Sequence, residues 1–165
     1  MITHIYFDWS RTLARQNSKK TFVDPAVPTA EKAATLYADT LTVLKTLVSM
    51  GYTLGIISNT SKSPQALKKS MKQIGIDRFF KGAVIYAGSG DLCRKPCKEI
   101  FAEALSQDKI SPSAALMVGN DYEKDIRGAR AAGLKALLVD RERPCSYKEK
   151  HIHNLSQLIE LLPEL

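Results

Sequence analysis

Short apolar runs alternate with amphipathic stretches along most of this 165-residue chain. The short runs are rich in β-favouring residues and are typical of strands buried on both faces, whereas the longer stretches repeat apolar residues at helical spacing. Expected strands are 2–7, 52–57, 83–87, 114–118 and 134–139, and expected helices are 39–50, 63–74, 96–105, 126–132 and 155–162. This alternation predicts an α/β fold, a doubly wound parallel sheet with helices on both faces, in one domain spanning residues 1–165.

The composition narrows the classes of partner. The chain carries 24 basic and 17 acidic side chains, a net charge of +7, which favours anionic partners such as phosphorylated molecules. The basic residues are scattered and form no compact nucleic-acid signature, so the sequence does not favour nucleic acid. No apolar run is long enough for a membrane span, and the N-terminus lacks a signal-peptide pattern. We therefore expect a cytoplasmic protein with no membrane partner.

The three cysteines, Cys93, Cys97 and Cys145, are too few and odd in number for a disulfide framework, which suits a reducing compartment. Cys93 and Cys97 flank Lys95, but no second Cys/His pair stands at ligand spacing. We therefore do not expect a metal or redox pair there. The segment 151–153, with two histidines, is expected at the surface near the last helix.

Polar residues follow four of the expected strands. They are Asp8 and Ser10, then Ser58 and Asn59, then Lys95, and finally Asn120, Asp121 and Asp125. In a doubly wound sheet these strand ends lie along one edge, so the side chains can share a site. A carboxylate nucleophile, a hydroxyl, a lysine and further acidic groups are what phosphoryl transfer requires. The ordinary alternative is a strand-capping aspartate, a loop hydroxyl and a solvated lysine.

Four segments resemble, in order, the motifs of the haloacid dehalogenase superfamily, whose members are mostly Mg²⁺-dependent phosphatases. The segments are Phe7-Asp8-Trp9-Ser10-Arg11-Thr12-Leu13, Leu54-Gly55-Ile56-Ile57-Ser58-Asn59, Arg94-Lys95-Pro96 with Glu99-Ile100-Phe101, and Val118-Gly119-Asn120-Asp121 with Asp125-Ile126-Arg127-Gly128-Ala129 and Ala132-Gly133. Each follows an expected strand, and together they span nearly the whole chain. The resemblance implies a Rossmann-like core.

The resemblance also implies roles for individual residues. Asp8 is similar to the nucleophile that also binds Mg²⁺, Ser58 to the residue that bonds a phosphoryl oxygen, and Lys95 to the lysine that bridges the two. The metal-holding segment contains Asn120, Asp121 and Asp125, and the backbone carbonyl of Ser10 is a further ligand. Asn59 and Trp9 are candidate substrate contacts. For Trp9, packing in the core beside Asp8 is an equally good alternative.

Two residues depart from the family pattern. Ser10 stands where phosphatases of this family usually carry a second aspartate, and a serine hydroxyl is too weak an acid to replace it near neutral pH. Asn120 replaces the usual first acid of the fourth motif, and an amide oxygen supplies no charge. Asp121 or Asp125 must then contribute more to metal binding.

The segment 14–37 is irregular, although a helix could begin at Thr29, and it is too short for a large helical cap. We expect a reduced cap or flap over an open site. Such a site admits a phosphorylated small molecule or macromolecule, or needs a neighbouring subunit of an oligomer as its lid.

These observations predict a Mg²⁺-dependent phosphohydrolase that acts on a phosphate ester through an aspartyl-phosphate intermediate. One alternative is a catalytically weak phosphate-binding or protein-interaction module that keeps the fold. Another is a dehalogenase or a phosphonate-cleaving enzyme, because the fold does not fix the reaction.

Overall fold

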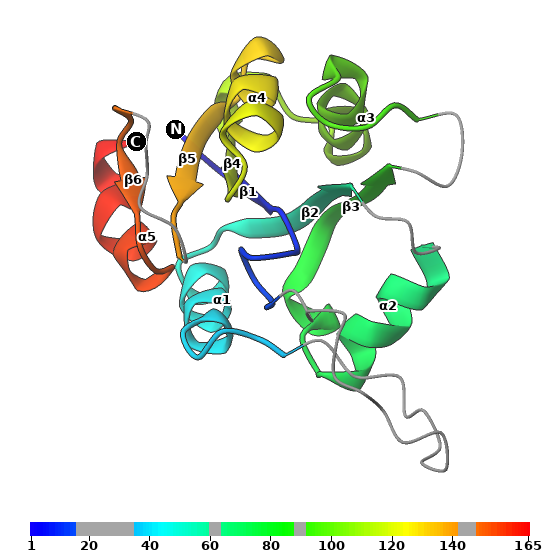
Figure 1. Cartoon of the computed structure of the whole chain (residues 1–165), viewed down its shortest axis with the longest axis vertical. Coiled ribbons are helices and arrows are strands. Elements are labelled where there is room, and N and C mark those ends of the chain that lie inside the picture. Colours follow the sequence, from blue (N-terminus) through cyan, green and yellow to red (C-terminus); the bar gives the residue numbers. More distant parts are fainter. Residues whose placement is uncertain (16–34, 60–63, 88–91, 142–147) are drawn as a thin grey trace, which may run out of the picture.

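A single parallel sheet organises the molecule (Figure 1). The computed structural model describes residues 1–15, 35–59, 64–87, 92–141 and 148–165. The strands within these ranges are β1 (His4–Phe7), β2 (Thr53–Asn59), β3 (Phe80–Ala87), β4 (Ala115–Gly119), β5 (Lys135–Val139) and β6 (His151–Ile152). Their order across the sheet is β3-β2-β1-β4-β5-β6. The predicted α/β fold with a parallel sheet is confirmed.

Helices cover both faces of the sheet, as predicted. They are α1 (Thr40–Ser49), α2 (Pro64–Gln73), α3 (Lys98–Asp108), α4 (Gly128–Ala131) and α5 (Ser156–Leu161), with single turns η1 (Asp77–Phe79), η2 (Pro112–Ala114), η3 (Tyr122–Arg127) and η4 (Leu162–Glu164). The apolar residues of α1, α2 and α5 share one core, and those of α3 and α4 share the other.

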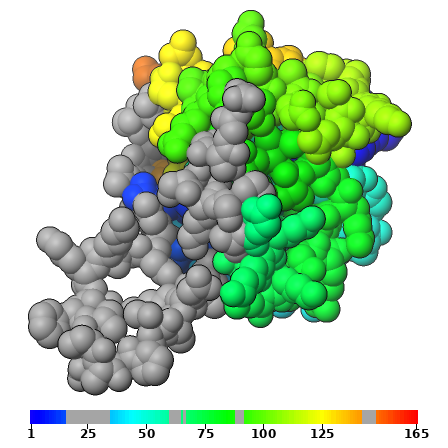
Figure 2. Space-filling view, turned by 90° about the vertical axis from the view of Figure 1, so that its right-hand side faces the viewer, coloured from blue at the N-terminus to red at the C-terminus, as the bar shows by residue number. Residues whose placement is uncertain are grey.

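The central strand β1 contributes to both cores because its side chains alternate. Ile5 and Phe7 belong to the core under α1, and Tyr6 belongs to the core under α3; all three are fully buried. Burying a side chain of the size of Phe7 stabilises the fold by about 2–3 kcal/mol. Figure 2 shows one face of the molecule, on which blue N-terminal residues are visible in small patches. The sheet thereby fixes the position of the residue that follows Phe7.

Burial and a hydrogen bond hold Tyr6 in its core. Its hydroxyl donates to the Asp108 carboxylate at 2.6 Å, and the same carboxylate accepts the Ala83 N–H at 2.9 Å. Burial first, and then this carboxylate, raise the pKa of Tyr6 far above its ordinary value. The contacts join the end of α3 to β1 and β3.

Two predicted elements begin or wind differently in the structure. Pro96 was expected in a first helical turn, but the Lys95–Pro96 bond is cis and α3 begins at Lys98. The helix expected over 126–132 begins earlier and is wound differently at its start, because η3 is a π-helical turn from Tyr122 to Arg127 in which the Ile126 N–H reaches the Asp121 carbonyl at 3.4 Å. Periodicity does not separate the two windings over one turn, and π-turns are frequent at functional sites.

The edge strand β6 was not predicted as a strand. It contains two residues, pairs with β5 through Leu138↔His151 and Val139↔Ile152, and lies where we expected a surface segment near the last helix. A two-residue strand is too short to show the alternation that marks longer strands.

The ends of the irregular segment lie beside each other. Ala14 and Leu36 form an antiparallel bridge, and the Arg15 N–H donates to the Thr35 carbonyl at 2.8 Å. Residues 16–34, most of the expected cap or flap, lie outside the described residues. None of the helices in the described ranges combines the length and apolar composition that a membrane span requires.

Candidate functional site

The order in which the chain adds strands to the sheet reverses at β1, and Asp8 lies at this point. The chain moves from β1 to β2 and β3 on one side, then returns to place β4 on the other side of β1. The Asp8 N–H donates to the Val118 carbonyl at 3.0 Å, which fixes Asp8 at the carboxyl edge of β1 and β4. In open α/β sheets this crevice is where ligands bind.

A buried lysine connects β2, the end of β1 and the turn η3 at this edge. The Lys95 ammonium donates to Asp8 Oδ1 at 2.8 Å, to Asp125 Oδ1 at 2.6 Å and to the Ile57 carbonyl at 2.7 Å. An ammonium has three donors, so all three are used. Lys95 is 3% exposed and Asp125 1%. The structure thus brings together three residues that the sequence places far apart.

The backbone of Lys95 is held by Asn59. The Asn59 Nδ2 donates to the Lys95 carbonyl at 3.0 Å, and the Lys95 N–H donates to Asn59 Oδ1 at 2.8 Å. Asn59 was expected to contact substrate, and it lines the pocket described below. Because both ends of its amide engage Lys95, the geometry assigns it the positioning of that lysine. No signal in the sequence distinguishes this arrangement.

Asp8 uses its two carboxylate oxygens differently. The Ser58 hydroxyl donates to Asp8 Oδ1 at 3.2 Å, the oxygen that also accepts from Lys95. Within the described part of the chain, no side chain donates to Asp8 Oδ2. Asp8 is 8% exposed and lines the pocket, so this second oxygen is the one available for a ligand.

The charges of this cluster do not balance. Burial opposes the ammonium charge, but the carboxylates of Asp8 and then Asp125 raise the pKa of Lys95 above its ordinary value. Burial raises the pKa of Asp125 to about 6, with the charge of Asp8 adding to the effect and Lys95 opposing it. When both acids are ionised, two negative charges face one positive charge. The cluster therefore attracts a proton or a cation.

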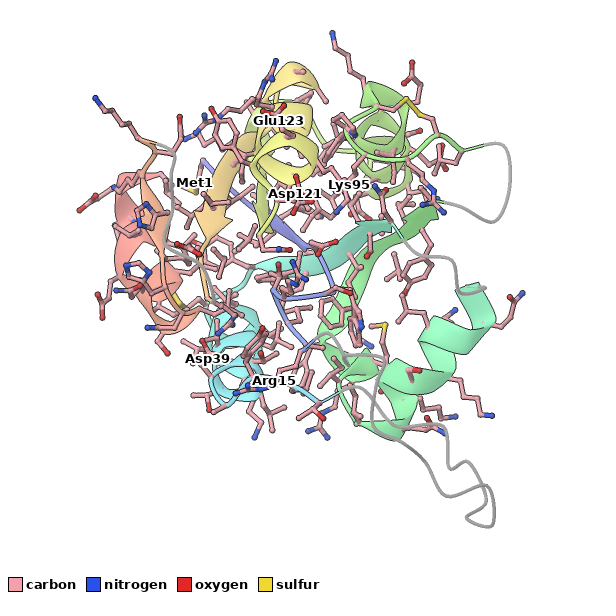
Figure 3. All side chains as sticks on the ribbon, in the orientation of Figure 1. Met1, Arg15, Asp39, Lys95, Asp121 and Glu123 are labelled. Carbon is pink, nitrogen blue, oxygen red and sulfur yellow. A yellow bond between two sulfur atoms is a disulfide. The ribbon has the colours of Figure 1, made fainter. Side chains whose placement is uncertain are left out.

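The loop after β4 brings in the remaining acidic groups. Asp121 caps η3 by accepting the Lys124 N–H at 3.0 Å, and it pairs with the Lys124 ammonium at 2.6 Å. Burial alone would raise the pKa of Asp121, but these contacts outweigh it and lower the pKa. Figure 3 shows Asp121 and Lys95 close to each other in that view.

Gly119, at the end of β4, allows Asp125 to reach the cluster. A Cβ on Gly119 would overlap the Asp125 carboxylate, so any larger residue there would displace this acid. The Asp121 N–H donates to Asp125 Oδ2 at 3.0 Å. Both oxygens of Asp125 are therefore engaged within the protein.

These residues surround a pocket of about 260 Å³. Its lining combines acidic, amide and basic side chains: Asp8, Ser10, Arg11, Asn59, Arg94, Lys95, Asn120, Asp121, Lys124 and Asp125. The sequence reasoning missed Arg11, Arg94 and Lys124 as site residues. The high basic content was the available signal, but scattered charges do not show which ones face the site.

Trp9 is buried in the core on the α1 side, at 8% exposure, and is absent from the pocket lining. The geometry favours the packing alternative for this residue. Ser10, in contrast, is exposed and lines the pocket. It holds its place through a bridge to Ala14.

The donor set of the pocket fits Mg²⁺. The Asp8 carboxylate, the Asn120 amide oxygen and the Asp121 carboxylate all belong to residues lining one cavity, and Mg²⁺ prefers oxygen ligands with several waters. The excess negative charge of the Asp8–Lys95–Asp125 cluster favours a cation at the same place.

A disulfide joins Cys93 and Cys97 across a Cα–Cα distance of 6.0 Å. Our expectation of no redox pair at these cysteines was therefore wrong. Sequence spacing does not reveal that the chain turns back around Lys95, and this turn brings the two sulfur atoms together. Cys145 lies outside the described residues.

The fold and the site define a Rossmann-like α/β protein with a carboxylate–lysine centre at the turning point of its sheet. Residues 8–139 match the family of haloacid dehalogenase-like hydrolases, and the chain belongs to that family. The resemblance inferred from the sequence is confirmed.

Curated relatives include named phosphatases. A glyceraldehyde 3-phosphate phosphatase of Methanothermobacter thermautotrophicus is 36% identical over 135 residues, which cover 76% of this chain and 58% of the relative. A phosphoserine phosphatase of Thermus thermophilus is 31% identical over 106 residues, covering 64% of this chain and 41% of the relative. The chain thus spans little more than half the length of the first relative.

Solved structures share the fold. An uncharacterized protein from Listeria monocytogenes serotype 4b has a TM-score of 0.82 at 24% identity, with 99% of this chain and 100% of that chain covered. A 2-haloacid dehalogenase from Pseudomonas syringae pv. Tomato DC3000 has a TM-score of 0.77 at 21% identity, with 99% of both chains covered.

Proposed function

We propose that this hydrolase is a Mg²⁺-dependent phosphatase that forms an aspartyl phosphate on Asp8. The observation that carries the proposal is the buried Lys95 ammonium, which contacts Asp8 and Asp125 beside a pocket that Asp8 also lines. A carboxylate at this position can attack phosphorus, and the lysine offsets charge on the phosphoryl oxygens.

The reaction proceeds in two displacements. Asp8 Oδ2 attacks phosphorus, a bond forms between them, and the ester P–O bond breaks. The leaving oxygen takes its proton from solvent, because Ser10 is too weak an acid to supply it. Water then attacks the phosphorus of the aspartyl phosphate, the bond between phosphorus and Asp8 Oδ2 breaks, and a proton of the water passes to solvent, which releases phosphate and free Asp8. Lys95 and Ser58 orient the carboxylate through Oδ1 in both steps.

The proposed ligands of Mg²⁺ are Asp8, Asn120, Asp121 and the backbone carbonyl of Ser10. When bound, the ion supplies positive charge to the phosphoryl oxygens. Asp125, which the sequence also placed among the ligands, holds Lys95 and the loop backbone with its two oxygens. We therefore propose that Asp125 positions Lys95 and the loop and does not bind the metal itself.

A small phosphorylated molecule is the proposed substrate. The named activities of the two phosphatase relatives support this class, as does the cavity of about 260 Å³. The basic side chains of Arg11, Arg94 and Lys124 favour a substrate with a second anionic group. A phosphorylated macromolecule and a lid from another subunit stay predictions, as do a cytoplasmic location and a single domain with residues 14–37 as a reduced cap.

The test is steady-state hydrolysis of p-nitrophenyl phosphate with and without Mg²⁺. We expect Mg²⁺-dependent turnover in the wild type and none in Asp8→Asn. An added carboxyl group in Ser10→Asp should raise turnover. The hydrolysis rate of an alkyl phosphate should increase more, by about 10²-fold, because its leaving group needs the proton most. The absence of turnover in both the wild type and Ser10→Asp would exclude the phosphatase.

Ser10 itself favours one alternative, a phosphate-binding or protein-interaction module that has lost efficient turnover. Such a module would trap the phosphate mimic BeF₃⁻ on Asp8 in the presence of Mg²⁺ without hydrolysing any ester. Detection of trapping by mass or by thermal stabilisation, together with silent kinetics, would establish this alternative.

A further inference from the structure

Two histidines and an aspartate converge at the far edge of the sheet. Asp140 directly follows β5, and His151 and His153 stand on either side of Ile152 in and after β6. Ile152 is buried, so the alternation of the strand places both imidazoles on the opposite face. The Asp140 N–H donates to the Ile152 carbonyl at 2.7 Å, which fixes the aspartate beside them.

The hydrogen bonds of the two rings orient them as metal ligands are oriented. The His151 Nδ1 lies 2.8 Å from the Glu149 carbonyl, and the His153 Nδ1 lies 3.2 Å from the Asp140 carbonyl. A carbonyl oxygen only accepts, so each Nδ1 carries the hydrogen, and each neutral ring keeps a bare Nε2. Metal-bound histidines almost always donate their other N–H in this way.

We propose that Asp140, His151 and His153 bind a divalent transition-metal ion, with Zn²⁺ as the representative ion. One ligand atom from each residue lies within 4.8 Å of the others. Zn–ligand bonds of about 2.0–2.1 Å require separations of about 3.4 Å, so side-chain rotations must close the difference. Asp140 and His151 are half-buried, and His153 is exposed.

The ligand chemistry separates this site from the proposed Mg²⁺ site. Two imidazoles and one carboxylate suit Zn²⁺, Ni²⁺ or Cu²⁺, whereas Mg²⁺ selects oxygen ligands. A bound ion would join the end of β5 directly to β6, an edge strand held by two paired residues. The inference is independent of the phosphatase proposal, because no residue of the cluster lines the pocket.

The experiment is a calorimetric titration of the metal-free, oxidised protein with ZnCl₂ near pH 7.5. We expect one saturable site, weakened by more than about tenfold in His153→Ala and more in His151→Ala/His153→Ala. The third histidine, His4, supplies the matched control, because His4→Ala should bind as the wild type does. Excess Mg²⁺ should not compete, because Mg²⁺ selects oxygen ligands.

Thiolates from any reduced protein are the competing explanation, because Cys93, Cys97 and Glu99 form the other metal-type cluster in the described ranges and reduction of the Cys93–Cys97 disulfide would free its sulfur atoms. The Cys93→Ser/Cys97→Ser/Cys145→Ser variant must retain the site. Loss of binding in that variant, full binding in the double histidine variant, or no saturable binding in the wild type would each overturn the proposal. Circular dichroism of the histidine variants, whose buried neighbour Ile152 is unchanged, establishes that they fold.

Discussion

Arg11 combines backbone strain with a position in the pocket. Its φ of 62° lies in the left-handed region, and its N–H donates to the Ala14 carbonyl at 2.7 Å in the tight turn after β1. A residue with a Cβ costs about 1 kcal/mol more than glycine in this conformation. Strained residues of this kind cluster at functional sites. We infer that the guanidinium is retained for binding at the expense of stability.

The substitution Arg11→Gly should therefore change stability and activity in opposite directions. Relief of the strain should stabilise the protein by about 1 kcal/mol. At about 2.1 cal/mol/K per residue, the entropy of unfolding of 165 residues is about 0.35 kcal/mol/K, so Tm should rise by about 3 °C. Loss of a charge-assisted contact of about 1.4 kcal/mol should lower kcat/KM about tenfold for a substrate with a second anionic group, such as phosphoserine.

Lys109 provides a matched control. It is the other described non-glycine residue with a positive φ, 55°, and it caps the exposed end of α3 away from the pocket. Lys109→Gly should raise Tm by a similar amount and leave kcat/KM unchanged. The pair separates the effect of the backbone from that of the charge.

Thermal melts and kinetics with phosphoserine and p-nitrophenyl phosphate measure both quantities. A lower Tm in Arg11→Gly would refute the strain argument, because relief of the strain should outweigh the additional conformational entropy that glycine loses on folding. An unchanged kcat/KM for phosphoserine would refute the role of the guanidinium. A decrease in kcat/KM for p-nitrophenyl phosphate, which has no second acidic group, would show that Arg11 contacts the reacting phosphate itself.

Three further predictions concern the buried cluster and the disulfide. The pKa of Asp125 in the folded protein is about 6, against an ordinary 3.8, so its contribution to the stability of the metal-free protein falls as pH rises between these values. Mg²⁺ should therefore raise Tm more at pH 7.5 than at pH 5. An equal rise in Tm at both pH values would contradict this prediction. Lys95→Met leaves two buried carboxylates without a counter-charge and should lower the free energy of unfolding by about 3–5 kcal/mol, measured in urea; a loss below 1 kcal/mol would contradict the buried ion pairs. Cys93→Ser/Cys97→Ser should lower the free energy of unfolding by about 2 kcal/mol, because the unfolded chain gains the entropy of the opened loop, and it should also reduce turnover. The same stability of the wild type with and without reductant would show that the disulfide contributes nothing.

The sequence predicted the sheet because its central strands are continuous apolar runs, and β1 and β4 are buried along almost their whole length. It also predicted that Asp8, Lys95 and Asp125 share a site, because parallel strands end at one edge. Contacts that depend on loop conformation could not be predicted. The amide of Asn59 that holds Lys95 is one, and the left-handed turn that aims Arg11 at the pocket is another.

The buried cluster does not supply the acid that is missing at Ser10. Lys95 gives all three of its donors to protein oxygens, so its proton is not offered to a leaving group, and the carboxylates raise its pKa further. Asp125 has a pKa of about 6 but is buried behind Lys95 with both oxygens engaged. Neither group can take the place of the missing acid. In the proposed phosphatase, proton delivery then depends on solvent in the pocket, which favours esters whose leaving groups need little help.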